Sequence, residues 1–131
     1  MNIRIATPDD ASRIVELEAQ AGCRVPLDMA GAETSWLVAE LDGTVQAAVQ
    51  ALLGKPFSAL EMLAINPDLS PHVKARIVMA LLPAGFQALH ATGAQYCVAT
   101  IPFRYKRYRR ALEKRGCVVM DQGSVLVKRL R

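Results

Sequence analysis

The segment ALEMLAINPDLSPHVKARIVMALLPAGFQALHATGAQYCVATI, residues 59–101, decides the fold of this chain. Residues 59–65 form a short apolar run that predicts a strand, and residues 95–101 form a second run that is almost wholly apolar. Between the two runs, Ser70 and Pro71 suit the N-cap and the first position of a helix. This order predicts two parallel strands joined by a right-handed helical crossover.

The helix of this crossover carries an apolar stripe that a proline interrupts. The stripe consists of Val73, Ile77, Val78, Leu81, Leu82, Phe86 and Leu89. Pro83 lies inside the pattern, where a proline removes a backbone hydrogen bond and clashes with the preceding turn. The sequence therefore predicts a kink or an early break of the helix at Pro83.

Two strand-like runs, residues 36–41 and 44–53, precede the crossover. Asp42 and Gly43 separate them, and an Asp-Gly pair between two such runs is a strong hairpin signal. Together with residues 59–65, these runs predict an antiparallel meander of three strands.

The N-terminal region predicts one more strand and a helix. Residues 2–6 alternate in polarity, and Thr7 and Pro8 then suit a helix start. The apolar positions of this helix follow helical spacing at Ala11, Ile14, Val15 and Ala19. Residues 23–35 show weak periodicity, which predicts a loop with one helical turn at residues 27–32.

The C-terminal region predicts a basic helix at residues 104–115 and a hairpin of residues 117–120 and 124–130. The whole pattern predicts an α/β fold with a mixed, mostly antiparallel sheet of six to seven strands. One parallel crossover joins two of the strands, and helices cover both faces. With 131 residues and no linker, the chain is predicted to form a single domain over residues 1–131.

Composition excludes several classes of protein. Hydrophobic residues make up 52% of the chain and charged residues 21%, so extended disorder is not expected. No apolar run approaches the roughly 18 to 20 residues of a membrane span, and the N-terminus has no signal-peptide core. The three cysteines are widely spaced, which indicates neither a zinc site nor a disulfide framework. We therefore expect a cytoplasmic protein with no membrane contact and no metal.

The positive charge is concentrated at the C-terminal end of the chain. Residues 1–103 carry 6 basic and 10 acidic side chains, whereas residues 104–131 carry 10 basic and 2 acidic ones. A concentrated positive field attracts phosphate groups more strongly than a diffuse one. The basic helix at residues 104–115 is thus either a solvated surface or a contact for a phosphate-bearing or acidic partner.

Four segments of the chain resemble one known family. They are IRIATPDDASRIVELEAQ (residues 3–20), WLVAELDGTVQAAV (36–49), ALEMLAINPDLS (59–70) and ALEKRGC (111–117). In their order and spacing they resemble the strand-to-helix entry, the hairpin, the fourth strand and the late helix of GNAT-superfamily N-acetyltransferases. The resemblance spans essentially the whole chain and implies a GNAT-like fold and acetyl-CoA or another acyl-CoA as cofactor.

The resemblance implies where that cofactor would bind. The arm of coenzyme A would pair with the fourth strand at Leu63, Ala64 and Ile65. The pyrophosphate would meet the following loop and helix start, at Ser70, His72, Val73, Lys74 and Ala75, where amide N–H groups and the helix dipole attract anions. The family's loop glycines are replaced here by Pro71, Val73 and Ala75. Arg104 would meet the adenine-ribose phosphates of coenzyme A.

The resemblance also implies catalytic residues. The family's usual general acid, a tyrosine on the late helix, corresponds to Leu112, which cannot donate a proton. Tyr108 lies one turn earlier on the same helix face and is the candidate replacement. Glu61 on the fourth strand is the candidate general base, acting directly or through water, or else a solvated residue on the open face.

Two functions therefore remain open. The first is an acyl-CoA-dependent N-acyltransferase that moves an acetyl group directly from the thioester to an unidentified amine. The second is a GNAT-fold protein without catalysis that uses the basic helix at residues 104–115 to contact nucleic acid or an acidic partner. The resemblance also leaves homodimer formation open.

Overall fold

The computed structural model describes residues 1–31, 36–101 and 104–120. The chain divides into two compact units, Met1–Ala99 and Thr100–Arg131, and each is described by itself. A single domain spanning the whole chain stays a prediction.

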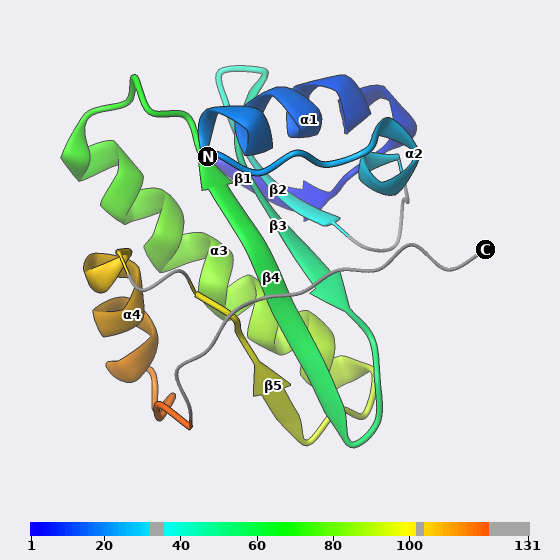
Figure 1. Ribbon diagram of the computed structural model, residues 1–131, viewed down its shortest axis with the longest axis vertical. Helices are drawn as coiled ribbons and strands as arrows, with labels where there is room; N and C mark the ends of the chain where they lie inside the picture. The colour runs from blue at the N-terminus through cyan, green and yellow to red at the C-terminus, as the bar shows by residue number, and fades with distance from the viewer. Residues whose placement is uncertain (32–35, 102–103, 121–131) are drawn as a thin grey trace. The chain divides into compact units, whose positions relative to one another are not determined.

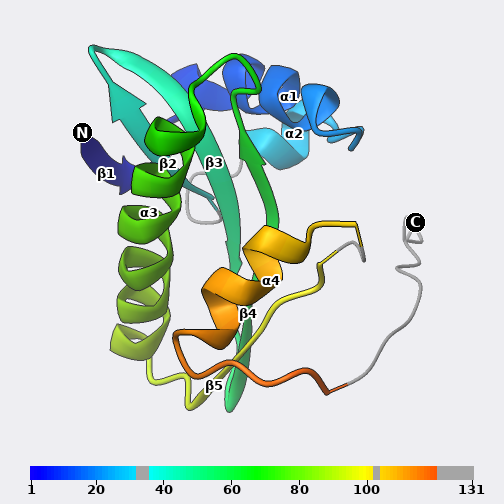
Figure 2. The same cartoon turned by 90° about the vertical axis from the view of Figure 1, so that its left-hand side faces the viewer.

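The first unit is a sheet with helices on both of its faces. Its elements are β1 (Asn2–Ile5), the 3-10 helix η1 (Pro8–Asp10), α1 (Ala11–Gln20), α2 (Leu27–Ala30), β2 (Trp36–Leu41), β3 (Thr44–Leu52), β4 (Phe57–Ile65), α3 (Pro71–Ala91) and β5 (Tyr96–Val98). The strand order is β1-β2-β3-β4-β5, and only β4 and β5 are parallel. The long helix α3 lies on one face, and α1 and α2 lie on the other (Figures 1 and 2). The predicted mixed α/β sheet with one parallel crossover is thereby confirmed.

The predicted number of strands, six to seven, is not met. Among the described residues the sheet has five strands, and residues 117–120 are not part of a strand. A strand needs a paired neighbour, and the predicted partner, residues 124–130, lies outside the described residues. The strand predicted at residues 95–101 is also shorter, since only Tyr96–Val98 pair with β4.

The hairpin between β2 and β3 forms where the sequence predicts it. Asp42 and Gly43 both have positive φ angles, 51° and 75°. Two positive φ values in a two-residue loop match the right-handed twist of antiparallel strands. Asp42 tolerates this conformation better than most residues, and Gly43 adopts it freely.

Helix α3 begins as predicted and does not break at its proline. The Ser70 hydroxyl accepts a hydrogen bond from the Val73 amide at 3.3 Å, and Pro71 occupies the first turn. The helix continues through Pro83 to Ala91, so of the two predicted outcomes, a kink or an early break, the break does not occur. Leu81 and Leu82 before the proline and Leu89 after it are buried, and this burial offsets the local cost of the proline, about 3 kcal/mol.

An arginine on β1 ties the start of α1 to the sheet. Arg4 donates two hydrogen bonds to the Asp10 carboxylate, at 2.6 and 3.0 Å, and two to Glu40 of β2, at 3.0 and 2.9 Å. Asp10 also accepts a bond of 2.7 Å from the Thr7 amide. The hydrogen bonds from Arg4 lower the pKa of Asp10 from 3.8 to about 2.

Helix α3 approaches β4 closely because a glycine leaves room for a leucine. A Cβ atom added at Gly85 would lie 2.9 Å from Cδ1 and 3.1 Å from Cδ2 of Leu60, which is fully buried. The absence of a side chain at this position thus sets the distance between helix and sheet.

We expect Gly85→Val to destabilise the protein by about 2 kcal/mol, because the added methyl groups overpack against Leu60. Ala88→Val, at an exposed position of the same helix, is the control and should cost well under about 1 kcal/mol. Urea unfolding of both variants measures the difference. Equal stability of the two variants would show that Leu60 does not press on Gly85.

The second unit contains one described helix, α4 (Lys106–Glu113). It is shorter than the predicted range of residues 104–115, and Gly116, with a φ of 88°, follows its last turn. Leu112 is buried, whereas the basic residues of the helix are mostly exposed. The amphipathic character that the sequence predicts is therefore present.

Candidate functional site

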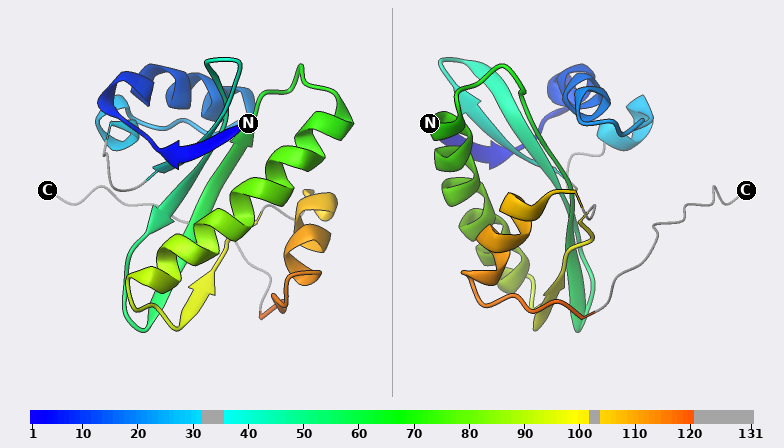
Figure 3. Two further views of the ribbon diagram at one scale, coloured as in Figure 1. Left: turned by 180° about the vertical axis from the view of Figure 1, so that it is seen from behind. Right: turned by 60° about the vertical axis from the view of Figure 1, so that its left-hand side comes forward.

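The C-terminal half of β4 has a free edge. Strand β5 pairs only with Phe57–Ala59, and no strand pairs with Met62–Ile65 on that side among the described residues. Seen from the front and from behind, β5 leaves β4 as the two strands diverge (Figures 1 and 3). A free strand edge offers backbone N–H and C=O groups to an extended ligand that carries amides.

Three predicted cofactor residues lie along this edge. Leu63, Ala64 and Ile65 are the last residues of β4 and follow the last residue that pairs with β5. Ala64 is buried, and Leu63 and Ile65 are half-buried. The structure thus places all three at the end of β4, and their contact with coenzyme A stays a prediction.

A β-bulge interrupts β4 at the same place. Gln50 pairs with Glu61 and Ala48 pairs with Ala64, so two residues of β4 stand opposite one residue of β3. Met62 has a φ of 54°, a backbone conformation that costs a non-glycine residue about 1–3 kcal/mol. Bulges and strained residues of this kind cluster near functional sites, and no glycine in the sequence signals this one.

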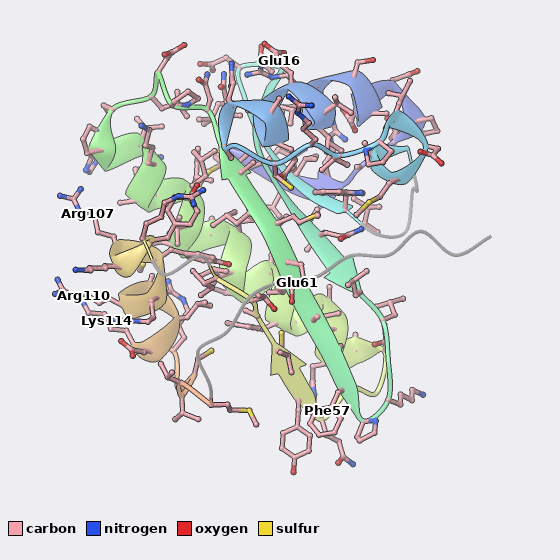
Figure 4. The ribbon with its side chains drawn as sticks, in the orientation of Figure 1. Glu16, Phe57, Glu61, Arg107, Arg110 and Lys114 are labelled. Carbon is pink, nitrogen blue, oxygen red and sulfur yellow. The ribbon has the colours of Figure 1, made fainter. Side chains whose placement is uncertain are left out.

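The bulge changes which face of the sheet each β4 residue occupies. Leu60 packs under Gly85 of α3, whereas Ala64 belongs to the buried cluster that contains Ile14 of α1. In a regular strand, residues four positions apart would share a face. Glu61 follows Leu60 and projects on the face opposite α3 (Figure 4). The candidate base is half-buried, beside the bulge and on the α1 side.

The N-terminus of α3 holds the predicted phosphate residues together, but few of its amides are free. The Val73 amide donates to the Ser70 hydroxyl, and the Lys74 amide donates to the Ser70 carbonyl at 3.0 Å. Pro71 has no N–H group. Among the described residues, the backbone amide of His72 is therefore the donor left in the first turn.

The side chains of this turn make one hydrogen bond to the preceding loop and line a surface pocket. The Lys74 ammonium donates to the Pro67 carbonyl at 2.6 Å, which leaves two of its three N–H groups for another acceptor. His72 and Ala75 line a surface pocket of about 430 Å³ with Met1, Arg76, Met79 and Ala80. No β4 residue lines this pocket, so it is separate from the free strand edge.

The other two predicted site residues belong to the second unit. Tyr108 is half-buried on α4, one turn before the buried Leu112. Arg104 precedes the helix, is exposed, and places its guanidinium carbon 4.7 Å from the centre of the Tyr105 ring.

Sequence reasoning missed a buried carboxyl group on α1. Glu18 is 1% exposed, and its Oε1 has no hydrogen-bond partner among the described residues. Burial raises its pKa from 4.5 to about 8. The helical spacing predicted for this helix includes Ala19, which is exposed. The signal was present, because Glu18 lies four residues after the buried Ile14.

The described part of the chain meets neither the requirements of a metal site nor those of a membrane span. No group of three or more His, Cys, Asp or Glu side chains there could hold a metal ion. Within those same residues, no helix has the length and apolar character needed to span a bilayer.

A meander followed by one parallel crossover, with a fourth strand that the fifth leaves, agrees with the GNAT-like fold that the sequence predicts. Comparison with solved structures confirms this fold class. No protein-family model matches the sequence, and no curated protein matches it.

Three solved structures illustrate the likeness. A ribosomal-protein-alanine N-acetyltransferase from Brucella melitensis biovar Abortus 2308 has 18% identity and a TM-score of 0.69, covering 98% of this chain and 99% of its own. A Mycobacterium tuberculosis protein in complex with CoA has 17% identity and a TM-score of 0.77, covering 96% and 76%. Diaminobutyrate acetyltransferase from Paenibacillus lautus, in complex with L-2,4-diaminobutyric acid and coenzyme A, has 17% identity and a TM-score of 0.71, covering 87% and 73%. At these identities the likeness shows the fold alone.

Proposed function

We propose that this protein is an N-acyltransferase that moves an acyl group, in the first instance acetyl, from coenzyme A to an amine. The observation that carries the proposal is the free edge of β4 beside the bulge at Met62. Structures of the same fold are known in complex with CoA, which supports coenzyme A as the ligand. A cytoplasmic location and a homodimer remain predictions.

The described residues fit the amide-bearing arm of coenzyme A better than they fit its phosphates. The amide-bearing arm suits the unpaired backbone of Leu63, Ala64 and Ile65. For the phosphates, the α3 N-terminus offers the His72 amide, the remaining N–H groups of Lys74 and the helix dipole. Arg104 is proposed for the adenine-ribose phosphates. A pyrophosphate held by so few donors should bind less tightly than one in a glycine loop.

The chemistry asks little of the protein besides positioning. Coenzyme A supplies a thioester, whose carbonyl carbon an amine can attack directly. We propose that Glu61 accepts the proton that the amine nitrogen loses as the new C–N bond forms, directly or through water. Backbone N–H groups of β4 would stabilise the oxyanion, and the sulfur of coenzyme A would leave and take up a proton. Tyr108 stays the predicted donor of that proton. The acceptor is an amine of unidentified structure.

We expect acetyl-CoA to bind the protein and raise its stability, by about 2.7 kcal/mol at one hundred times Kd. Lys74→Ala should weaken acetyl-CoA binding about 3- to 10-fold, because it removes the cation nearest the α3 N-terminus. The same variant should leave S-acetyl-pantetheine, which lacks the pyrophosphate, unaffected. Isothermal titration calorimetry with both ligands measures this contrast.

Lys55→Ala, at another exposed lysine, is the control and should bind both ligands like the parent protein. No heat and no stabilisation at millimolar acetyl-CoA would contradict the proposed function. Equal weakening of both ligands by Lys74→Ala would instead refute the assignment of the phosphates to the α3 N-terminus.

A further inference from the structure

Three cations of α4 and the C-cap residue Lys114 lie on one side of the helix. Lys106, Arg107, Arg110 and Lys114 are all exposed. At 100° per residue their positions fall within an arc of about 100° around the helix axis, and we call them the basic face. Arg107, Arg110 and Lys114 project from the same side of α4 in Figure 4.

The burial of the opposite side fixes the direction of this face. Leu112 is buried, and Tyr108 and Ala111 are half-buried. All three positions lie outside the arc of the basic face. The helix therefore cannot turn its cations inward without exposing Leu112 to water.

Within the residues that the structure describes, no acidic side chain forms an ion pair with the basic face. Glu113 is the only carboxylate in residues 104–115, and its ion pair is with Arg109, at 3.9 Å. Within the described part of the chain, none of the four cations of the basic face forms an ion pair or side-chain hydrogen bond. Four like charges held on about two turns of helix attract a partner whose negative charges are equally dense.

The spacing and the side-chain types of the basic face fit one kind of polyanion, a nucleic-acid duplex. From Lys106 to Lys114 the helix rises about 12 Å, which matches the rise of three to four successive phosphates on one strand of a duplex. Guanidinium groups bind phosphate oxygens through paired hydrogen bonds. An α-helix also fits the major groove of B-form DNA.

The same face lacks the groups that other partners need. It carries no aromatic ring for stacking on unpaired bases and no Asn or Gln for reading adenine. It also carries no apolar residue to form the dry centre of a protein interface. We propose that the basic face is a docking surface for the phosphate backbone of duplex nucleic acid, independent of sequence. This role goes beyond acyl transfer and does not depend on it.

Fluorescence anisotropy of the full chain with a labelled 20-base-pair DNA of arbitrary sequence tests the proposal. Four phosphate contacts predict that log K falls against log salt with a slope of about −3.6, or about 150-fold between 50 and 200 mM NaCl. Arg107→Ala combined with Arg110→Ala should halve this slope. The affinity for DNA should then fall only about 12-fold between 50 and 200 mM NaCl. Alanine is the best helix former, so the variant should keep α4 intact.

Arg24→Ala combined with Lys55→Ala is the matched control. It removes the same charge at two exposed positions outside α4 and should keep the parent slope. Duplex RNA that binds as tightly as DNA would support the proposal, because both present the same backbone phosphates. No binding at 50 mM NaCl, or equal slopes for the two double variants, would overturn it. Tighter binding of poly-glutamate or of single-stranded DNA would also overturn it.

Discussion

Replacing Glu18 by glutamine is expected to stabilise the protein by about 3 kcal/mol at pH 7 and by almost nothing at pH 4. Glu18 is the buried carboxyl on α1 whose Oε1 has no partner among the described residues. Glutamine has nearly the same shape but no proton to lose. The substitution therefore isolates the cost of keeping an ionisable group in this core.

The direction follows from the two pKa values of Glu18. The folded state holds its proton up to a pKa of about 8, whereas the unfolded chain releases it near 4.5. Between these values the unfolded state is favoured by about 1.4 kcal/mol for each pH unit, and the penalty is constant above about pH 8. The protonated Glu18 carboxyl group therefore makes its full contribution to the free energy of unfolding below pH 4.5. This contribution is lost as the pH rises from 4.5 to 8.

Urea unfolding of both proteins from pH 4 to pH 9 measures this difference. Glu16→Gln, at an exposed position of the same helix paired with Arg13, should change stability by no more than about 0.5 kcal/mol across this range. Parallel pH curves for Glu18→Gln and the parent protein would show that Glu18 is ionised in the folded state.

Arg4→Met is expected to destabilise the protein by about 2–3 kcal/mol at pH 7, the second large effect. It removes the cation that holds Asp10 and Glu40 together and leaves the Asp10 carboxylate, 10% exposed, with only Thr7 as a donor. Breaking one side of a buried ion pair costs more than the pair contributes, and the partial exposure of Arg4 reduces that cost.

The effect of Arg4→Met should also depend on pH. The folded pKa of Asp10 lies near 2 and the unfolded value near 3.8, so the stabilisation is present above pH 3.8 and is lost as the pH falls to 2. The difference in the free energy of unfolding between Arg4→Met and the parent protein should therefore decrease by about 2 kcal/mol as the pH falls from 3.8 to 2. This window lies below that of Glu18, and the two effects can be measured separately.

A double-mutant cycle with Asp10→Asn completes the test, because asparagine still accepts a hydrogen bond from the Thr7 amide. The two substitutions should cost less together than the sum of their separate costs. Arg13→Met is the control, since the ion-pair partner of Arg13, Glu16, is 56% exposed, and we expect a loss of about 1 kcal/mol. Additive effects of Arg4→Met and Asp10→Asn would show that the bond between them contributes no stability.

The features that the sequence predicted well are those set by neighbouring residues. Asp42 and Gly43 specify their turn by backbone conformation alone, and Ser70 and Pro71 specify a helix start in the same way. The crossover was predictable because each of its elements is marked by its own apolar pattern. The likeness in fold to known acetyltransferases follows from the order of these local signals.

What the sequence could not show depends on contacts between distant segments. The bulge at Met62 arises from the register of β4 against β3, and nothing in the residues around it marks the extra position. Pro83 looked like a helix breaker until the burial around it was known. The saturation of the Val73 amide by Ser70 was likewise visible only in three dimensions.

The bulge in β4 also determines which changes of chain length this protein can accept. Because one extra residue shifts the phase of the strand, removing it would exchange inside and outside for every later residue of β4. Ala64 would then leave the cluster around α1, and the loop that leads into α3 would start from the wrong face. Substitutions can therefore change the chemistry along this edge, whereas an insertion or deletion of one residue in β4 would disrupt the fold.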